Sequence, residues 1–246
     1  MLLEPSGTKH LVTLDREMVT VPSIGVVRAD ALRERVGRRW IVGDRAFLVL
    51  TPSIRDEIEL LRRGAQIIGP KDAPTLVWNC DLKAGDFVVE IGAGSGGLTL
   101  ALAHTVGRTG RVVTYDIRRE FLEMAQRNVT EAGLGAVVEF KIGDARSGIP
   151  ERDADAVILD IPDPWEAVSP AAEAVKPCGH VGSYSPNAEQ VNRTVKALRA
   201  SGFVEIRTVE IIEREIVAHD AGTHPSFAPL GHTGYLTFAR KVLDTF

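Results

Sequence analysis

Short apolar runs alternate with helix-favouring stretches from residue 86 to the end of the sequence, and this alternation constrains the fold more than any other feature. The spacing predicts helices over residues 97–106, 120–132, 165–176 and 188–200. It predicts strands over residues 87–91, 111–117, 137–142, 156–161, 180–185, 203–210 and 234–242. Strands and helices that alternate in this way form a parallel sheet, covered on both faces and joined by right-handed crossovers. We therefore expect an α/β, doubly wound fold.

The first 50 residues have a different pattern, in which short apolar runs are separated by Gly25, Gly37 and Gly43. This pattern is typical of a small β-rich unit with tight turns. Ser53 then begins a helix, with Asp56 three residues later as in a capping box, and Gly64 ends it. A second helix begins at Asp72. We expect a small β-rich domain over residues 1–52 and an α/β domain over residues 53–246.

Composition excludes several classes of protein. The chain of 246 residues has a net charge of −4 and a sequence pI of about 5.9, which argues against a dedicated nucleic-acid-binding domain. No apolar run approaches the roughly 18 residues of a membrane span, and no signal peptide is evident. Cys80 and Cys178 form no paired motif, so we expect no metal and no disulfide framework. We expect a cytoplasmic protein without a membrane partner.

A glycine-rich turn follows the first predicted strand of the α/β domain. Gly92, Gly94 and Gly97 fit the dinucleotide pattern G-x-G-x-x-G, whereas Gly92, Gly94 and Gly96 fit the G-x-G-x-G pattern common in methyltransferases that use S-adenosylmethionine. Glu90 lies two residues before the first glycine. An acid there favours the methyl donor, because a pyrophosphate needs a positive helix N-terminus free of extra negative charge.

Acidic residues follow the next strands in chain order. Asp116 is suited to accept hydrogen bonds from ribose hydroxyls, and Asp144 from an adenine amino group; each can also be a turn former. Asp160 follows the fourth strand and precedes a loop that Pro162 and Pro164 stiffen. Carboxyl ends of parallel strands share one crevice, so we expect these acids around one cofactor. Trp165 either stacks on a base or packs against the next helix.

Four segments make the chain resemble the tRNA (adenine-58-N1)-methyltransferase family: residues 63–72, 89–100, 159–165 and 231–240. The resemblance implies a class I methyltransferase (Rossmann-like) sheet with a small N-terminal β domain, a tRNA partner and a homotetramer. It implies methyl transfer from S-adenosylmethionine to N1 of adenine 58 in the T-loop, with adenine 57 as a further target. It places the cofactor at Glu90, Gly92, Gly94, Ser95, Gly96, Gly97, Leu98, Asp116, Phe121, Asp144 and Asp160.

The same resemblance makes Asp160 the catalytic residue. We assign Gln66, Lys71, Trp165 and His232 to the substrate side, and expect phosphate contacts from Lys71 and from arginines between residues 28 and 39 and at 62–63. Two positions depart from the family pattern: Gly69 stands where an aromatic or His is common, and His224-Pro225 stands where the family has Arg-Pro.

Three alternatives remain at this point. The acidic pI favours a methyltransferase acting on a protein or small molecule. The G-x-G-x-x-G spacing alone permits an NAD-dependent oxidoreductase. A non-catalytic subunit is the third hypothesis, and the intact acids argue against it.

Overall fold

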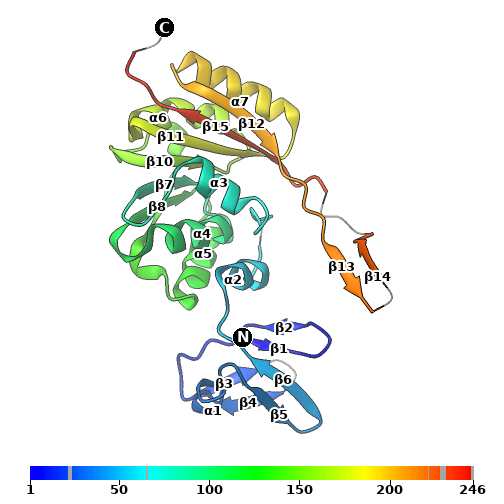
Figure 1. The fold of residues 1–246 in the computed structure, drawn as a ribbon. Coiled ribbons are helices and arrows are strands. Elements are labelled where there is room, and N and C mark those ends of the chain that lie inside the picture. Colours follow the sequence, from blue (N-terminus) through cyan, green and yellow to red (C-terminus); the bar gives the residue numbers. More distant parts are fainter. Residues whose placement is uncertain (22–23, 65, 221, 228–230, 245–246) are drawn as a thin grey trace. The chain divides into compact units, whose positions relative to one another are not determined.

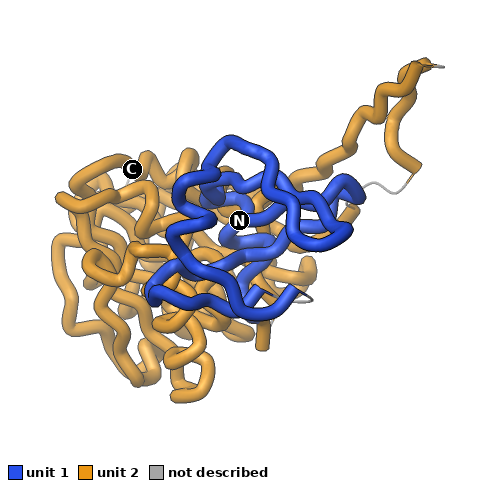
Figure 2. Tube along the Cα trace, turned by 90° about the horizontal axis from the view of Figure 1, so that it is seen from below, with its two compact units in different colours: residues 1–62 blue, residues 63–246 orange. Residues whose placement is uncertain are grey.

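The chain divides into two compact units, Met1–Arg62 and Arg63–Phe246 (Figure 2). The computed structural model describes residues 1–246 apart from 22–23, 65, 221, 228–230 and 245–246. Helix α2 (Ile54–Leu60) belongs to the first unit. The division therefore falls after Arg62, whereas the sequence pattern placed a domain boundary after residue 52.

The first unit is mainly β-structure. Strands β1 (Leu2–Leu3), β2 (Lys9–His10), β5 (Arg39–Val42) and β6 (Arg45–Val49) form an antiparallel sheet in the order β2-β1-β6-β5. Strands β3 (Met18–Val21) and β4 (Gly25–Arg28) pair separately, and helix α1 (Ala29–Arg33) follows. The rings of Trp40 and Phe47 pack 5.8 Å apart in the core. The capping box of Ser53 and Asp56 at the start of α2 is confirmed.

The second unit is built on a seven-stranded sheet in the order β12-β15-β11-β10-β7-β8-β9 (Figure 1). Its strands are β7 (Phe87–Ile91), β8 (Arg111–Asp116), β9 (Val138–Ile142), β10 (Ala154–Leu159), β11 (Val175–Ser185), β12 (Val204–Glu210) and β15 (Tyr235–Arg240). Strand β7 pairs in parallel with β8 and β10, as expected from the alternation.

The last strand corrects the prediction of a parallel sheet. Strand β15 runs antiparallel to both β11 and β12. A parallel neighbour requires a crossover, usually through a helix, whereas an antiparallel neighbour does not. No helix occurs among the described residues between β12 and β15; a separate hairpin of β13 (Ile216–His219) and β14 (Gly222–Pro225) occupies that segment.

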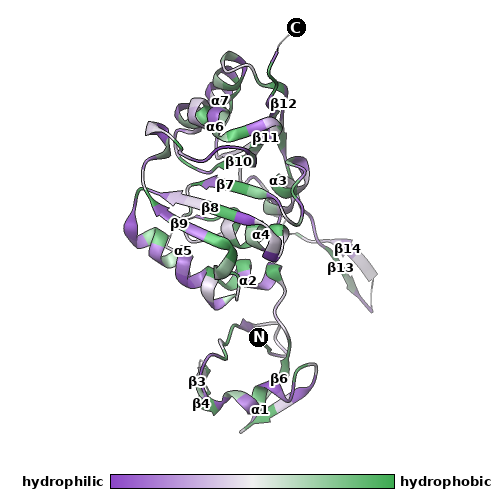
Figure 3. Cartoon of the chain, turned by 90° about the vertical axis from the view of Figure 1, so that its left-hand side faces the viewer, coloured by the Kyte–Doolittle hydropathy of each residue, from purple (hydrophilic) through white to green (hydrophobic). Residues whose placement is uncertain are grey.

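Helices cover the sheet of the second unit. They are α3 (Ala73–Asn79), α4 (Gly97–Val106), α5 (Arg119–Glu131), α6 (Val168–Ala174) and α7 (Ala188–Ala200), with short 3-10 turns η1 (Gly107–Thr109), η2 (Gly135–Val137), η3 (Ala145–Ser147) and η4 (Pro164–Ala167). Strands β7 and β10 are buried along almost their whole length, and Figure 3 shows the hydrophobic colouring of the central strands. This sheet therefore provides a rigid edge on which loops can present side chains.

Candidate active site

The glycine turn begins where two strand ends come unusually close together. Gly92 has a φ of +103°, and a Cβ built on it would lie 2.0 Å from the carbonyl oxygen of Asp160. The amides of Gly92 and Ala93 both donate to the Tyr115 carbonyl, at 2.8 and 2.9 Å. The turn is therefore held between the ends of β10 and β8, and its first position requires glycine.

Asp116 binds the glycine turn directly. Its Oδ2 accepts a hydrogen bond from the Gly94 amide at 3.0 Å, and its Oδ1 accepts one from the Arg118 amide at 2.9 Å. The residue is only 5% exposed. Gly94 has a φ of +50°, and nothing lies within 4 Å of a Cβ built there, so its outer side is open. Asp116 is thus oriented before any ligand arrives.

The segment after residue 63 supports the other side of the turn. The Gly64 amide donates to Ser95 Oγ at 3.0 Å, and Asn128 Nδ2 donates to the Ser95 carbonyl at 2.8 Å. A Cβ on Gly97 would lie 3.1 Å from Ile67 Cβ, and Leu98 is buried at the start of α4. These contacts explain why small residues occupy the turn, and they fix the N-terminus of α4.

Glu90 lies fully buried beneath the turn. The Thr99 hydroxyl donates to its Oε2 at 2.6 Å, while its Oε1 has no hydrogen-bond partner in the described part of the chain. Burial, with a smaller contribution from the Asp160 and Asp116 carboxylates, raises the pKa of Glu90 to about 8. Glu90 is therefore mainly protonated at neutral pH and can donate a hydrogen bond.

Asp160 follows the last residue of β10, and its amide donates to the Ile91 carbonyl at 2.8 Å. Part of the residue is accessible, although protein surrounds the carboxyl group. This burial, together with the Asp116 carboxylate, raises the pKa of Asp160 to about 7. The carboxyl group can therefore gain or lose a proton near neutral pH, as a group that handles a proton during a reaction must.

Asp144 and Phe121 both have arginine partners. Asp144 Oδ2 lies 2.8 Å from Arg146 Nη2, and Asp144 Oδ1 lies 2.9 Å from Arg146 Nε. This guanidinium lowers the pKa of Asp144. Arg146 Nη1 also lies 3.4 Å from Glu166 Oε2, in the 3-10 turn η4. The Arg118 guanidinium lies 3.8 Å from the Phe121 ring centroid.

Two of the substrate-side residues are engaged within the protein. Lys71 is buried, and its Nζ donates to Asp72 Oδ1 at 2.7 Å and to the Ile211 carbonyl at 2.6 Å. The Thr233 hydroxyl donates to the second Asp72 oxygen at 2.7 Å. Lys71 therefore joins three segments and does not face outward toward a phosphate. Trp165 packs against α7, with the Arg193 guanidinium 4.9 Å from its ring.

His232 lies at the sheet edge formed by β11, β12 and β15. Its Nδ1 lies 2.6 Å from Glu210 Oε1, and its Nε2 lies 2.9 Å from the Pro186 carbonyl oxygen. The hydrogen bond to Pro186, followed by that to Glu210, raises the pKa of His232. Its ring centroid is 4.8 Å from that of Tyr235.

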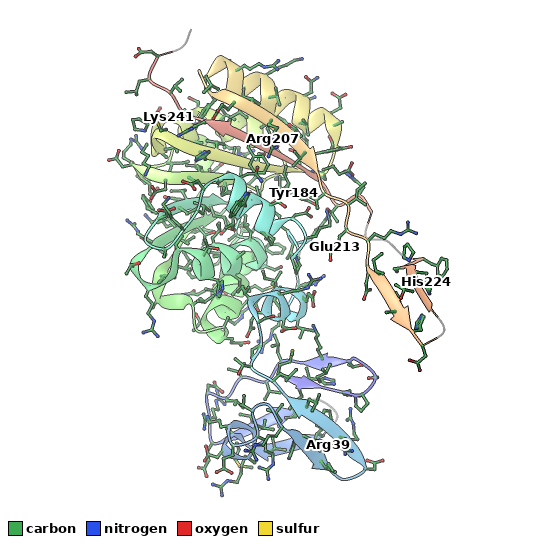
Figure 4. The ribbon with its side chains drawn as sticks, in the orientation of Figure 1. Arg39, Tyr184, Arg207, Glu213, His224 and Lys241 are labelled. Atoms are coloured by element: carbon green, nitrogen blue, oxygen red, sulfur yellow. The ribbon has the colours of Figure 1, made fainter. Side chains whose placement is uncertain are left out.

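Tyr184 is a site residue that the sequence analysis missed. It is labelled in Figure 4 and lies on β11. Its hydroxyl donates to the Thr233 carbonyl, and Gln66 hydrogen-bonds to it. Burial and the nearby Asp72 and Asp160 carboxylates raise its pKa to about 12, so the phenol stays protonated. Its position at the carboxyl end of a predicted strand was the signal that could have identified it.

No group of three or more His, Cys, Asp or Glu side chains in the described ranges could hold a metal ion. None of the helices there is long and apolar enough to cross a membrane.

The sheet order, the antiparallel last strand and the acids after successive strands define a class I methyltransferase. Residues 47–226 match the family model described as "tRNA methyltransferase complex GCD14 subunit". The chain belongs to this family, the tRNA (adenine-58-N1)-methyltransferases, whose methyl donor is S-adenosylmethionine.

Individual relatives support this assignment. The chain is 36% identical to the tRNA (adenine(57)-N(1)/adenine(58)-N(1))-methyltransferase TrmI of Methanocaldococcus jannaschii, over 98% of this chain and 94% of that protein. Among solved structures, an S-adenosylmethionine-dependent O-methyltransferase of Thermotoga maritima is similar with a TM-score of 0.89 and 31% identity, over 100% of this chain and 93% of that one. The tRNA (m1A58) methyltransferase TrmI of Aquifex aeolicus is similar with a TM-score of 0.78 and 26% identity, over 96% and 98%.

Proposed function

We propose that this protein transfers a methyl group from S-adenosylmethionine to N1 of adenine 58 in the T-loop of tRNA, and that adenine 57 is a further target. The names of the relatives support this choice of substrate. The observation that carries it is the placement of Asp160, a partly accessible residue at the end of β10 whose carboxyl group is buried and whose backbone lies against the glycine turn.

The residues of the turn fit the cofactor. Gly94 leaves open space beside an oriented Asp116, which suits the ribose hydroxyls, and Glu90 Oε1 is a buried polar atom without a partner in the described part of the protein. We assign the cofactor to the full set expected from the sequence: Glu90, Gly92, Gly94, Ser95, Gly96, Gly97, Leu98, Asp116, Phe121, Asp144 and Asp160. When bound, S-adenosylmethionine supplies an electrophilic methyl group.

Asp160 is the proposed catalytic residue. Adenine N1 carries a lone pair, so the protein must position the base, and no strong base is needed to create the nucleophile. Methylation places positive charge on the ring. A carboxylate that accepts a hydrogen bond from the exocyclic amine stabilises this charge and can take up a proton afterwards. A pKa near 7 suits both tasks.

Of the four residues expected to contact the substrate, one is now given a different role. Gln66, Trp165 and His232 remain candidate substrate contacts. Lys71 instead becomes a positioning residue, because its ammonium group is buried against Asp72. Phosphate contacts are assigned to exposed arginines of the first unit, Arg28, Arg38 and Arg39 among them, and to Arg62 and Arg63. We also infer a cytoplasmic homotetramer, whose oligomeric state light scattering of the purified protein would test.

Mass spectrometry of nucleosides tests the proposal directly. Unmodified tRNA is incubated with the protein and methyl-labelled S-adenosylmethionine, and we expect labelled 1-methyladenosine at position 58. The similarity to a protein titled O-methyltransferase favours a second candidate, methyl transfer to oxygen in another substrate. Label that enters small molecules or proteins but not tRNA would support that candidate and overturn the first. Binding of NAD without binding of S-adenosylhomocysteine would exclude both.

A further inference from the structure

A cavity lies on the same edge of the sheet as Asp160, away from the glycine turn. Its volume is about 330 Å3, and it lies between the first turns of α7 and the ends of β12 and β15. It is lined by Ala188, Val191, Thr208, Val209, Glu210 and Tyr235. None of these residues belongs to the proposed cofactor set, so the cavity is a separate feature.

Polar side chains gather on the sheet face that forms the floor of this cavity. Ser185, Tyr235 and Glu210 are paired side by side across strands β11, β15 and β12. Two residues further into the sheet, Ser183, Thr237 and Thr208 are paired in the same way. Paired residues of neighbouring strands, and residues two apart on one strand, share a face of a sheet. All six side chains therefore lie on the side covered by α7.

Two of these hydroxyls are buried without a protein partner. Ser183 and Ser185 are 0% exposed, and neither Oγ atom has a hydrogen-bond partner among the described residues. Buried polar groups are nearly always hydrogen-bonded, because an unmade bond destabilises the fold. The Thr208 and Thr237 hydroxyls, by contrast, satisfy each other at 2.9 Å. These two serines lie behind the residues that line the cavity, and on this face the lining itself consists of Thr208, Glu210 and Tyr235.

The rim of the cavity is aromatic and anionic. Tyr235 packs against the His232 ring, and His232 in turn binds Glu210 and the Pro186 carbonyl. A carboxylate at the rim opposes a phosphate but accepts hydrogen bonds from an amino group. Val191 and Ala188 form an apolar wall on the α7 side. A flat ligand with apolar faces and a polar edge, such as a nucleobase, matches this lining.

The position of the cavity identifies which base could reach it. The sheet order is β10-β11-β15-β12, so the cavity lies two to three strands from the end of β10. Neighbouring strands are about 4.8 Å apart, which places the cavity roughly 10–14 Å from Asp160. We propose that it is a second base subsite, which receives the base of a nucleotide flanking the methyl-accepting adenosine. This inference rests on the proposed function.

The test combines a filled cavity with an RNA that lacks a base. Val191→Trp places an indole in the cavity, and Lys196→Trp places one on an exposed position of the same helix as the control. Full-length tRNA transcripts carry an abasic nucleotide at one position on either side of the acceptor adenosine. For the wild type and Lys196→Trp, we expect removal of one flanking base to lower kcat/KM about ten- to a hundredfold, as loss of a stacked base does.

For Val191→Trp we expect intact tRNA to be methylated as slowly as that abasic RNA, and no further loss when the base is removed. Affinity for S-adenosylhomocysteine and the Tm should match those of Lys196→Trp. Equal abasic losses in the wild type and Val191→Trp at every flanking position would overturn the subsite. If the wild type methylates no tRNA at all, it is the proposed function that fails.

Discussion

The carbonyl oxygen of Asp160 lies so close to Gly92 that a Cβ on Gly92 would be 2.0 Å from it. Two backbone segments that carry the proposed cofactor turn and the proposed catalytic carboxyl group are therefore in direct contact. Any side chain at residue 92 has to push these segments apart, so the geometry of both depends on this one glycine.

Gly92→Ala should abolish binding of S-adenosylhomocysteine and lower the Tm. The added methyl group meets the Asp160 carbonyl, and the φ of +103° disfavours an L-residue besides. Gly133→Ala is the matched control, because Gly133 also has a positive φ, +77°, but open space around it. Calorimetric titration and thermal unfolding of both variants separate the collision from the backbone strain. Equal losses in the two variants would contradict the collision.

Asp116→Ala should weaken cofactor binding at least tenfold. Hydrogen bonds to a charged group contribute roughly 1.5–3 kcal/mol each. The carboxylate also holds the Gly94 and Arg118 amides, so its loss additionally loosens the turn. Titration with S-adenosylhomocysteine measures the effect. An affinity within threefold of the wild type would rule out a ribose contact at Asp116.

Asp160→Ala should fold, retain appreciable cofactor binding and lose most N1 methylation. Removal of one preorganised electrostatic contact typically lowers the rate by about 10²–10³. The wild-type rate should also fall as pH drops through about 7, because protonation neutralises the Asp160 carboxylate. A pH–rate profile measured together with the variant checks both points, and near-normal turnover in the folded variant would refute the assignment.

Glu90 should make the protein less stable as pH rises. Its folded-state pKa of about 8 lies above the ordinary value of 4.5, so between these values the folded protein holds a proton that the unfolded chain releases. The free energy of unfolding therefore falls as pH rises across this range. Glu90→Gln still accepts the Thr99 hydrogen bond and should reduce this dependence. Urea unfolding near pH 5 and near pH 8 measures it, and an unchanged slope would contradict the burial effect.

Charge reversal at Arg28, Arg38 and Arg39 should weaken tRNA binding and leave cofactor affinity unchanged. For each phosphate that is no longer neutralised, the slope of log affinity against log salt should become shallower by about 0.9, if duplex RNA behaves as B-DNA does. Binding assays at several salt concentrations measure this slope. If neither affinity nor slope changes, these side chains form a solvated face and the tRNA surface lies elsewhere.

Much of the second unit could be predicted from the sequence, because its signals are local. Strand β7 and helices α4 and α7 have the predicted bounds, since apolar runs and helical periodicity reflect burial directly. The Gly92 turn is specified by a backbone conformation that only glycine adopts easily. Asp116 ends its strand, and Asp144 and Asp160 follow theirs, as expected, and their binding roles stay predictions.

The features that sequence analysis missed depend on contacts between distant segments. The direction of β15 is set by its pairing with β11. The hydrophobic pattern within a strand does not indicate which strand it will pair with. Lysine is a residue type that often contacts phosphates. The Lys71 ammonium group is nevertheless buried against Asp72 and the carbonyl of Ile211, which is 140 residues away in the sequence. The strands of the β13–β14 hairpin are short and largely exposed, so they lack the apolar alternation that identifies a half-buried strand.

The Lys71–Asp72 ion pair has a consequence for the segment between β12 and β15. Lys71 binds the carbonyl of Ile211 at the start of this segment, and Asp72 binds the hydroxyl of Thr233 at its end. Both ends are thus fastened to one buried point, and the strands on either side are paired with each other. The β13–β14 hairpin lies between these two attachment points, and a change in its length is expected to affect stability only weakly. The hairpin can therefore be lengthened or shortened while the edge of the sheet that carries Asp160 keeps its register.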